Sequence, residues 1–182
     1  MTRIMIIRHA EKPTDDGAIR GVSEHGVHDR HALSVRGWQR AGALVRFFAP
    51  PGETGTAEHI ATPSTIIASA ATLESPSVRS RQTVAPLADE LGVPVTSDHT
   101  KGEELALATA ALAQPSPVLI AWHHKQIPRL ARAITGEEID CPAHWPDERF
   151  DLVWVLEQNP TGEWKFHQIP QRLLPNDGDR GI

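Results

Sequence analysis

The chain has 182 residues, of which 40% are hydrophobic and 23% charged, and this is typical of one globular domain with a buried core. Its formal net charge of -5 argues against nucleic acid as a partner. No apolar run has the length of a membrane span, and the first residues do not resemble a signal peptide, so we expect no membrane partner. The single cysteine, Cys141, excludes an internal disulfide and favours a reducing, cytoplasmic location.

The first part of the sequence predicts a strand, a loop and a helix. Residues 3–7 are a short β-branched run that stops at charged side chains, as a buried strand does. Residues 13–32 show no hydrophobic periodicity and predict a loop. Ser34 is a candidate N-cap, because apolar residues recur after it at helical spacing. These residues are Trp38, Ala41, Leu44, Val45 and Phe48.

Short strands and helices alternate through the rest of the chain. Strands are predicted at 65–69, 94–98 and 118–121, helices at 75–92, 102–113 and 126–136, and a hairpin at 151–158 and 164–169. This alternation predicts an α/β fold: a three-layer α/β/α sandwich with a mostly parallel central sheet, helices on both faces and a C-terminal antiparallel hairpin. We expect one domain at 1–175 and a frayed tail at 176–182.

Two of the apolar strands end in histidine. The first leads into Arg8 and His9, and the strand at 118–121 leads through Trp122 to His123. Ligands of open α/β sheets bind outside the carboxyl ends of the strands, so these side chains are expected to meet there. Arg79 follows another strand, near the start of a helix. Two histidines, two arginines and a helix N-terminus favour a phosphate-like anion.

The segment RHAE, residues 8–11, resembles the Arg-His-Gly signature of the histidine phosphatase superfamily, also called phosphoglycerate mutase-like. The segments LSVRGWQRA, SPSVRSRQT and VLIAWHH continue this resemblance in the family's order. They place Arg79 at the core arginine and His123 at the second core histidine. The match covers residues 3 to about 135. The long helical insertion of true mutases is missing, so the chain is similar to the short, bacterial-type phosphatases.

The resemblance implies a metal-independent phosphohydrolase, a phosphomonoesterase without a cofactor. His9 is implied as the nucleophile that becomes a phosphohistidine, and Arg8, Arg79 and His123 as the groups that hold the phosphoryl oxygens. The substrate would be a phosphorylated small molecule or a phosphoprotein. The alternative is a catalytically weak or inactive member that binds a phosphorylated metabolite or protein. The sequence leaves the oligomeric state open.

An acid must protonate the leaving oxygen and later activate water. Glu103 or Glu104 is the candidate, because the family often places this acid between the core arginine and the second histidine. Glu11 is the second choice, and a substrate-assisted route stays open. Four residues are candidates for contacting substrate: Glu11, Lys12, Trp122 and His124.

Other features depart from the family pattern. Asp15 stands where many members have a phosphate-facing asparagine, and a carboxylate there would repel phosphate. The insertion AATLE, residues 70–74, is expected to reshape the rim of the site. The motif HGVHDRH holds His25, His28 and His31, which suit either a zinc site or, as we prefer, a loop that overhangs the pocket. Trp145 lies in a proline-rich loop and is expected on the surface or at the rim.

Overall fold

The computed structural model describes residues 1–52, 55–136 and 139–182. Its strands are β1 (Thr2–Arg8), β2 (Thr65–Ala68), β3 (Val95–Thr96), β4 (Val118–Trp122), β5 (Leu152–Gln158) and β6 (Trp164–Pro170). Its helices are α1 (Val35–Phe48), α2 (Arg79–Leu91), α3 (Glu104–Leu112), the short 3-10 helix η1 (His124–Gln126) and α4 (Ile127–Thr135). In the described part of the chain, no helix is long and apolar enough to cross a membrane.

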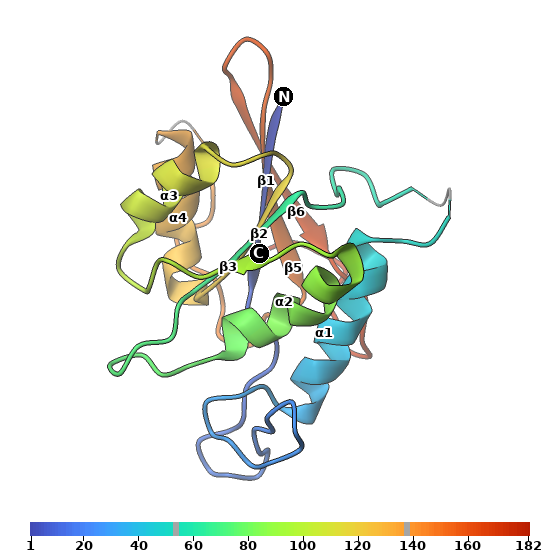
Figure 1. Cartoon of the computed structure of the whole chain (residues 1–182). Coiled ribbons are helices and arrows are strands. Elements are labelled where there is room, and N and C mark those ends of the chain that lie inside the picture. Colours follow the sequence, from blue (N-terminus) through green and yellow to red (C-terminus); the bar gives the residue numbers. More distant parts are fainter. Residues whose placement is uncertain (53–54, 137–138) are drawn as a thin grey trace.

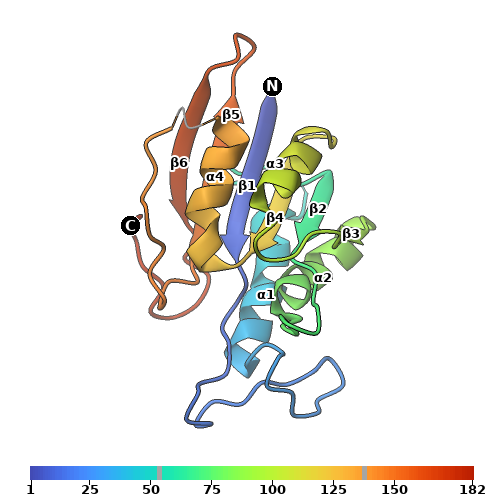
Figure 2. The ribbon, with the colours of Figure 1, turned by 90° about the vertical axis from the view of Figure 1, so that its left-hand side faces the viewer.

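The strands form one six-stranded sheet in the order β3-β2-β4-β1-β5-β6 (Figure 1). The pairs β2–β3, β2–β4 and β1–β4 are parallel, whereas β5 runs antiparallel to β1 and β6 antiparallel to β5. Helices α1 and α2 cover one face, and α3 and α4 cover the other (Figure 2). The predicted fold class is therefore confirmed, including the mostly parallel sheet and the C-terminal hairpin.

Alternation along β1 explains why the sheet has a core on each face. Ile4 and Ile6 point into the cluster beneath α3 and α4, and Met5 and Ile7 point into the cluster beneath α1 and α2. All four side chains are fully buried. Burial of such side chains stabilises the fold by roughly 1.5–3 kcal/mol each, so β1 is firmly fixed. The residues that directly follow β1 are therefore also held in a fixed position.

The helix ends follow the predicted capping residues, with one shift. The Ser34 side chain accepts a hydrogen bond from the backbone N–H of Gly37, as an N-cap does, and Gly92 ends α2 with a left-handed φ of 64°. Helix α2 begins at Arg79, four residues later than predicted. The backbone N–H of Val78 donates instead to the carbonyl of His31, so the segment before α2 is tied to the first loop.

The C-terminal segment 176–182, which we expected to fray, is tied to the domain. Asp177 is buried against Arg40, with Oδ1 2.7 Å from Nη2. The backbone N–H of Ile182 donates to the Gln168 side chain at 2.9 Å. These anchors could not be predicted from local patterns, because they join residues that are more than 100 positions apart or on different elements.

Trp145 is another difference from prediction. We expected it on the surface or at the rim, but it is only 3% exposed and packs in the core beside Trp154, with ring centroids 5.3 Å apart. Its indole N–H donates to the carbonyl of Arg149 at 2.8 Å. A large apolar ring with its one polar group satisfied is stable in a core, even when a proline-rich loop supplies it.

Candidate active site

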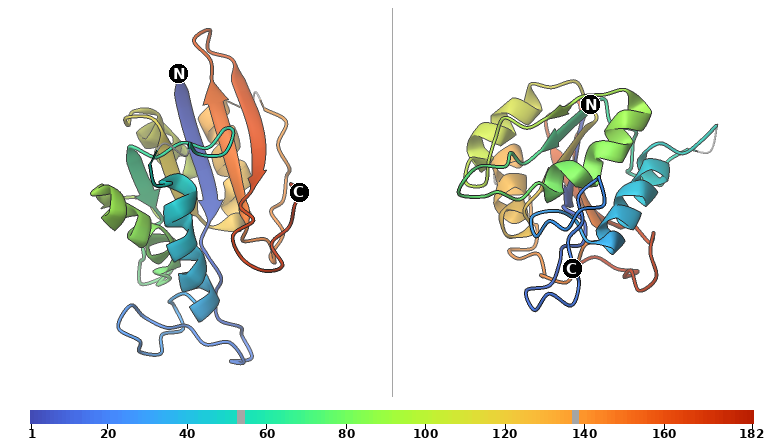
Figure 3. Two further views of the ribbon diagram at one scale, coloured as in Figure 1. Left: turned by 90° about the vertical axis from the view of Figure 1, so that its right-hand side faces the viewer. Right: turned by 60° about the horizontal axis from the view of Figure 1, so that its bottom comes forward.

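The first loop and the end of β4 meet at the carboxyl edge of the sheet. The backbone N–H of His9 donates to the carbonyl of Trp122 at 3.2 Å, which extends the β1–β4 pairing by one residue. The rings of His9 and His123 consequently lie edge to face, with centroids 6.3 Å apart. The loop that follows β1 extends from this end of the molecule (Figure 3). The predicted convergence of the two histidines is present.

A cavity of about 220 Å³ opens at this edge. Basic side chains and imidazoles dominate its wall, and no carboxylate of the described residues is among those that line it. The lining residues are Arg8, His9, Lys12, Arg79, Lys101, His123, His124 and Lys125. Five formal cations around so small a space produce a strongly positive potential, which selects an anion.

His9 is prepared to act as a nucleophile. Its Nδ1 lies 2.8 Å from the carbonyl oxygen of Ala10, and because a carbonyl only accepts, Nδ1 carries the proton. The other ring nitrogen, Nε2, therefore keeps a free electron pair. Burial, together with the positive charge of Arg8, holds the pKa of His9 well below its usual value of about 6.5. The imidazole is neutral at neutral pH.

Three contacts hold the loop that carries His9. The backbone N–H of Ala10 donates to Thr83 on α2 at 2.8 Å, and the hydroxyl of Ser34 donates to the carbonyl of Glu11 at 3.0 Å. Gly37 allows the loop to approach α1, because a Cβ there would lie 2.4 Å from the Glu11 carbonyl oxygen. The nucleophile is thus fixed against both helices of one face.

Arg8 is buried and held by backbone carbonyls. Its Nη1 donates to the carbonyls of Asp147 and Arg149 at 2.5 and 3.2 Å, and its guanidinium carbon lies 3.7 Å from the centroid of the Phe150 ring. Burial lowers its pKa to about 10, which still leaves it charged at neutral pH. Its Nε is buried and has no hydrogen-bond partner among the described residues.

Arg79 resembles Arg8 in its surroundings. It is the first residue of α2, its Nη1 donates to the carbonyl of Arg30 at 3.3 Å, and burial lowers its pKa. Its Nε is likewise buried without a hydrogen-bond partner in the part of the chain that the structure describes. Both arginines line the cavity, and their guanidinium charges favour an oxyanion ligand there.

Two further histidines complete the wall. Nε2 of His123 is 3.0 Å from the hydroxyl of Ser69, and burial lowers the pKa of His123 to about 4. Nε2 of His124 is 2.6 Å from Oδ1 of Asp147. Burial and the nearby Arg8 lower the pKa of His124, while Asp147 opposes this shift. His124 is thus an imidazole with a carboxylate partner at the cavity.

The predicted acids Glu103 and Glu104 do not line the cavity. Glu103 is exposed, and its carboxylate accepts from the backbone N–H of Thr100 at 2.7 Å. Glu104 is fully buried, and its Oε1 accepts from Gly102 N–H and from the indole of Trp122 at 3.0 and 3.2 Å. Glu104 Oε2 is buried without a hydrogen-bond partner among the described residues, and Arg129 Nε lies 3.8 Å from it.

Two predicted substrate contacts also lie away from the cavity. Glu11 forms ion pairs with Arg40 at 2.8 Å and with Arg36 at 3.1 Å, behind the loop that carries His9. Trp122 is fully buried under α3 and α4, because it continues the inward alternation of Val118 and Ile120 along β4. Lys12 and His124, the other two candidates, do line the cavity.

Sequence reasoning missed Lys101 and Lys125. Lys101 lies in the turn before α3, and Lys125 comes directly after the two histidines that end β4. The only signal was their proximity to other candidates: KGEE precedes a predicted helix, and HHK follows a predicted strand. Exposed lysines are common at such positions, so the pattern alone did not distinguish them.

The first loop forms a second, larger cavity of about 540 Å³. It shares Lys12 and Arg79 with the smaller cavity, and His28 and His31 contribute to its wall. Asp15 lines this second cavity and not the smaller one. The loop is therefore placed to contact the organic part of a ligand bound through its anion.

The three histidines of HGVHDRH do not gather into a metal site. Among the residues 1–52, 55–136 and 139–182, the one group of metal-ligating side chains with atoms within 4.8 Å of one another lies elsewhere. His25 is highly exposed, whereas His28 and His31 line the larger cavity. The chain turns at Gly26, where φ is 76°, so the three histidines do not share one face of a regular helix.

The arrangement was compared with known proteins. No family model and no curated protein sequence matches the chain. Among solved structures, the alpha-ribazole phosphatase from Shigella flexneri is similar at a TM-score of 0.55 and 14% identity, covering 97% of this chain and all (100%) of that one. A phosphoserine phosphatase from Entamoeba histolytica, in complex with phosphoserine, matches at 0.53 and 12% identity, over 96% and 100% of the two chains.

A phosphoglycerate mutase from Plasmodium falciparum is similar at a TM-score of 0.51 and 11% identity, covering 100% of this chain and 98% of that one. The similarity extends over nearly the whole of each chain, and every one of these proteins is of the histidine phosphatase, phosphoglycerate mutase-like type. At such low identities the comparison establishes the architecture. The chain therefore has the histidine phosphatase fold, as the resemblance of its motifs implied.

Proposed function

We propose that this protein is a phosphomonoesterase that acts through a phosphohistidine on His9, without a metal ion or cofactor. The observation that carries the proposal is the cavity itself. A neutral imidazole with a free Nε2 lies there among cations, and the guanidinium groups of Arg8 and Arg79 belong to residues of the cavity wall. A phosphoryl group supplies oxygens for these donors and a phosphorus atom for the imidazole.

The proposed reaction has two displacements. The electron pair of His9 Nε2 attacks phosphorus, a P–N bond forms, and the P–O bond to the leaving group breaks. Arg8, Arg79 and His123 hold the oxygens, and the Ala10 carbonyl accepts from Nδ1–H as positive charge develops on the ring. Water then attacks phosphorus, the P–N bond breaks, and inorganic phosphate and the free imidazole result.

The leaving oxygen needs a proton, and we assign its donor to His124. The protonated ring gives a proton to the leaving oxygen and takes one from water in the second displacement, so the cycle balances. Asp147 supports the charged form through its 2.6 Å contact. We prefer His124 to Glu103 or Glu104, because both carboxylates lie outside the cavity wall.

The mechanism requires a neutral His9 and a protonated His124, and these two requirements predict that the rate is highest at acidic pH. His9 must be neutral, and its pKa is well below 6.5; His124 must be protonated, and its pKa is also lowered. The rate should therefore fall as the pH rises through the lowered pKa of His124, so the optimum lies on the acidic side of the usual histidine pKa of about 6.5. Binding of an anionic substrate raises the pKa of His124 and broadens the optimum.

We propose a small phosphorylated metabolite as the substrate, in preference to a phosphoprotein. The first loop walls a 540 Å³ cavity next to the anion site, with Ile19, Arg20 and His31 among its lining residues. A pocket of this size with both apolar and charged groups suits a small organic ligand. A cytoplasmic location stays a prediction, which the single cysteine supports.

The first test is hydrolysis of p-nitrophenyl phosphate by chelator-treated protein between about pH 4 and 8. We expect turnover with an acidic optimum, and no turnover by His9→Ala. The exposed His25→Ala variant, outside both cavities, is the matched control and should be fully active. Turnover that survives in His9→Ala contradicts the assignment of the nucleophile.

The alternative is a member that binds phosphate esters without hydrolysing them. The absence of a carboxylate from the described wall of the cavity favours it, since many phosphatases use one as the acid. Calorimetric titration of wild type with a phosphate monoester decides between the two. Tight binding without release of phosphate, even from an aryl ester, supports the binding role.

A further inference from the structure

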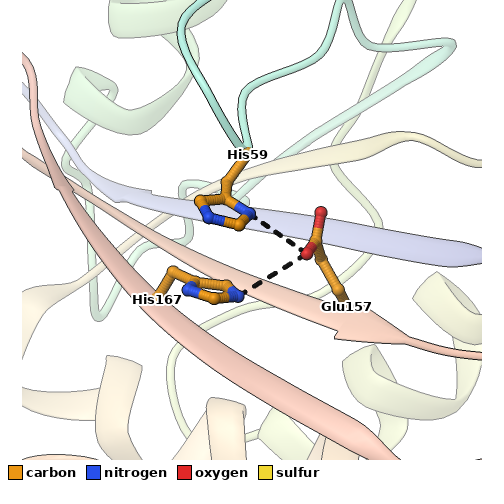
Figure 4. A group of neighbouring side chains, drawn as sticks. All are labelled: His59, Glu157 and His167. Carbon is orange, nitrogen blue, oxygen red and sulfur yellow. Dashed lines mark hydrogen bonds and ion pairs between the residues drawn. The ribbon is translucent and has the colours of Figure 1, made fainter.

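A second cluster of histidines lies at the other end of β1 (Figure 4). His59 comes from the segment before β2, Glu157 from β5 and His167 from β6. His59 Nδ1 is 3.3 Å from Glu157 Oε2, and His167 Nε2 is 3.6 Å from the same oxygen. We propose that these three side chains bind a zinc ion that has a structural role.

The separations between the donor atoms suit one ion. Zinc lies about 2.0–2.1 Å from histidine nitrogen and about 2.0–2.2 Å from carboxylate oxygen, so neighbouring ligands of a tetrahedron are about 3.4 Å apart. The two measured separations, 3.3 and 3.6 Å, lie on either side of this value, and all three atoms lie within 4.8 Å of one another. A water molecule would complete four-coordination.

His59 Nδ1 and Glu157 Oε2 form a hydrogen bond, so His167 Nε2 is the donor atom of the three that is left without a partner among the described residues. His167 Nε2 is buried and makes no hydrogen bond with any described residue, and Glu157 is only 7% exposed. At 3.6 Å the nitrogen and the carboxylate oxygen are too far apart to share a proton. A cation between them satisfies the nitrogen and the carboxylate together, which is the usual reason for such a group to be buried.

A neighbouring arginine orients the carboxylate, as groups around metal ligands do. Arg3 Nη2 holds the other carboxylate oxygen, Glu157 Oε1, at 2.6 Å, which leaves Oε2 available for the ion.

An imidazole binds a metal in the plane of its own ring, so ligation of one ion by both histidines requires one ring to turn out of the stack that the two rings form. The rings of His59 and His167 stack with centroids 3.7 Å apart and planes at 13°, although one comes from a loop and the other from a strand. His59 also adopts a left-handed φ of 65°, which costs a residue with a side chain free energy. Ligation by a metal compensates for this backbone conformation.

The site is remote from the proposed chemistry. Glu157 pairs with Arg3 in the β1–β5 register, and His9 follows six residues later along the chain, so the two sites are about 20 Å apart at 3.3 Å per residue. The ion would join the segment around His59 to the β5–β6 hairpin. Its loss should therefore affect stability and leave the anion cavity intact.

Calorimetric titration of the chelator-treated full chain with zinc chloride tests the proposal. The buffer contains no phosphate, because zinc phosphate is insoluble, and the cations around the anion cavity disfavour a metal ion there. We expect one ion per chain in wild type, and at least a tenfold weaker affinity in His59→Gln and in His167→Gln. His25→Gln, the exposed control, should bind as wild type does. Circular dichroism establishes that each variant is folded.

Anomalous diffraction from a zinc-soaked wild-type crystal gives the position of the ion and needs no variant. A peak between His59 Nδ1, Glu157 Oε2 and His167 Nε2 supports the site. A peak only at the anion cavity, no peak at all, or an affinity unchanged in both glutamine variants overturns it.

Discussion

The two ends of β1 hold histidines in opposite electrostatic settings. At the carboxyl end, His9 and His123 are surrounded by arginines and lysines, and no carboxylate of the described residues lines the cavity. At the amino end, His59 and His167 share a buried carboxylate, Glu157. Figure 3 shows the loop after β1 at one end of the molecule and the turn of the β5–β6 hairpin at the other.

The comparison teaches that neighbours decide what an imidazole does. Burial lowers the pKa of His9, His123 and His167, and so favours the neutral imidazole at both ends of β1. A neutral imidazole can act as a nucleophile or as a metal ligand. Surrounding cations repel a metal ion and attract a phosphate, which favours the first role for His9, whereas an adjacent carboxylate favours the second for His167. Four predictions test this contrast, from the largest expected effect to the smallest.

Removal of one cationic side chain at the carboxyl end of β1 should have the largest effect, which is a loss of kcat/KM. Arg79→Gln should lower kcat/KM for an aryl phosphate by about 10²–10³-fold, because a donor to the transferring phosphoryl group is lost. Steady-state kinetics measures this decrease in kcat/KM. Arg81→Gln changes an exposed arginine on the same helix and should stay within about twofold of wild type. Equal losses in the two variants would indicate a general charge effect instead of an oriented contact.

The leaving group should reveal the proton donor. His124→Gln should slow hydrolysis of alkyl phosphates by about 10–100-fold and aryl phosphates much less, because an aryl oxide leaves without a proton. Asp147→Asn should show the same pattern more weakly. Glu103→Gln serves as the comparison, since Glu103 is exposed outside the cavity wall. If only the Glu103 variant shows the leaving-group dependence, the acid predicted from sequence is correct and His124 is not the donor.

The buried His123 should make stability depend on pH. Its pKa is about 4 in the folded protein and about 6.5 unfolded, so between these values only the unfolded state takes up the proton. Stability is therefore unaffected above about pH 6.5 and is lost as the pH falls toward 4. The shift corresponds to about 3 kcal/mol, which partial exposure reduces to about 2.

Urea unfolding at about pH 7 and pH 4.5 measures this dependence. Wild type should lose about 2 kcal/mol more than His123→Gln over that interval. A variant that loses as much as wild type would show that other groups, such as His9, carry the whole pH dependence.

The smallest expected effect is a change in thermal stability, and it concerns the proposed zinc site at the amino end of β1. A chelator should lower the thermal midpoint of the protein by about 4 °C from its value at a free zinc concentration of about ten times Kd, because the metal binds only the folded state. Turnover of an aryl phosphate at low temperature should not change. A large loss of turnover on chelation would instead place a required metal at the carboxyl end and break the contrast between the two sites.

Several features of the fold and site could be predicted because they are local. An apolar run that ends in histidine specifies both a buried strand and the residue at its edge, and this located His9 and His123. Ser34 and Gly92 fixed helix ends through capping chemistry that depends on a few neighbouring residues. Strand alternation would also have placed Trp122 in the core, had it been extended past Ala121.

Other features depend on contacts between distant segments. His59 and His167 are 108 positions apart and carry no motif, so only the folded sheet brings them together. The pairing of His124 with Asp147 likewise requires the loop before β5 to pack against η1. Glu104 lies at a helix start, where an acid is often exposed, but here it turns inward to Trp122.

The central claim is that His9 forms a covalent bond to phosphorus, and trapping that intermediate is the most direct test. Wild-type protein is mixed with a phosphate monoester, quenched rapidly under alkaline conditions that preserve phosphohistidine, and analysed by peptide mass spectrometry. The proposed mechanism predicts one acid-labile phosphoryl group on His9 of wild type, and none on His9→Ala. Steady turnover by wild type without any phosphorylated His9, or with the phosphoryl group on another residue, would contradict it.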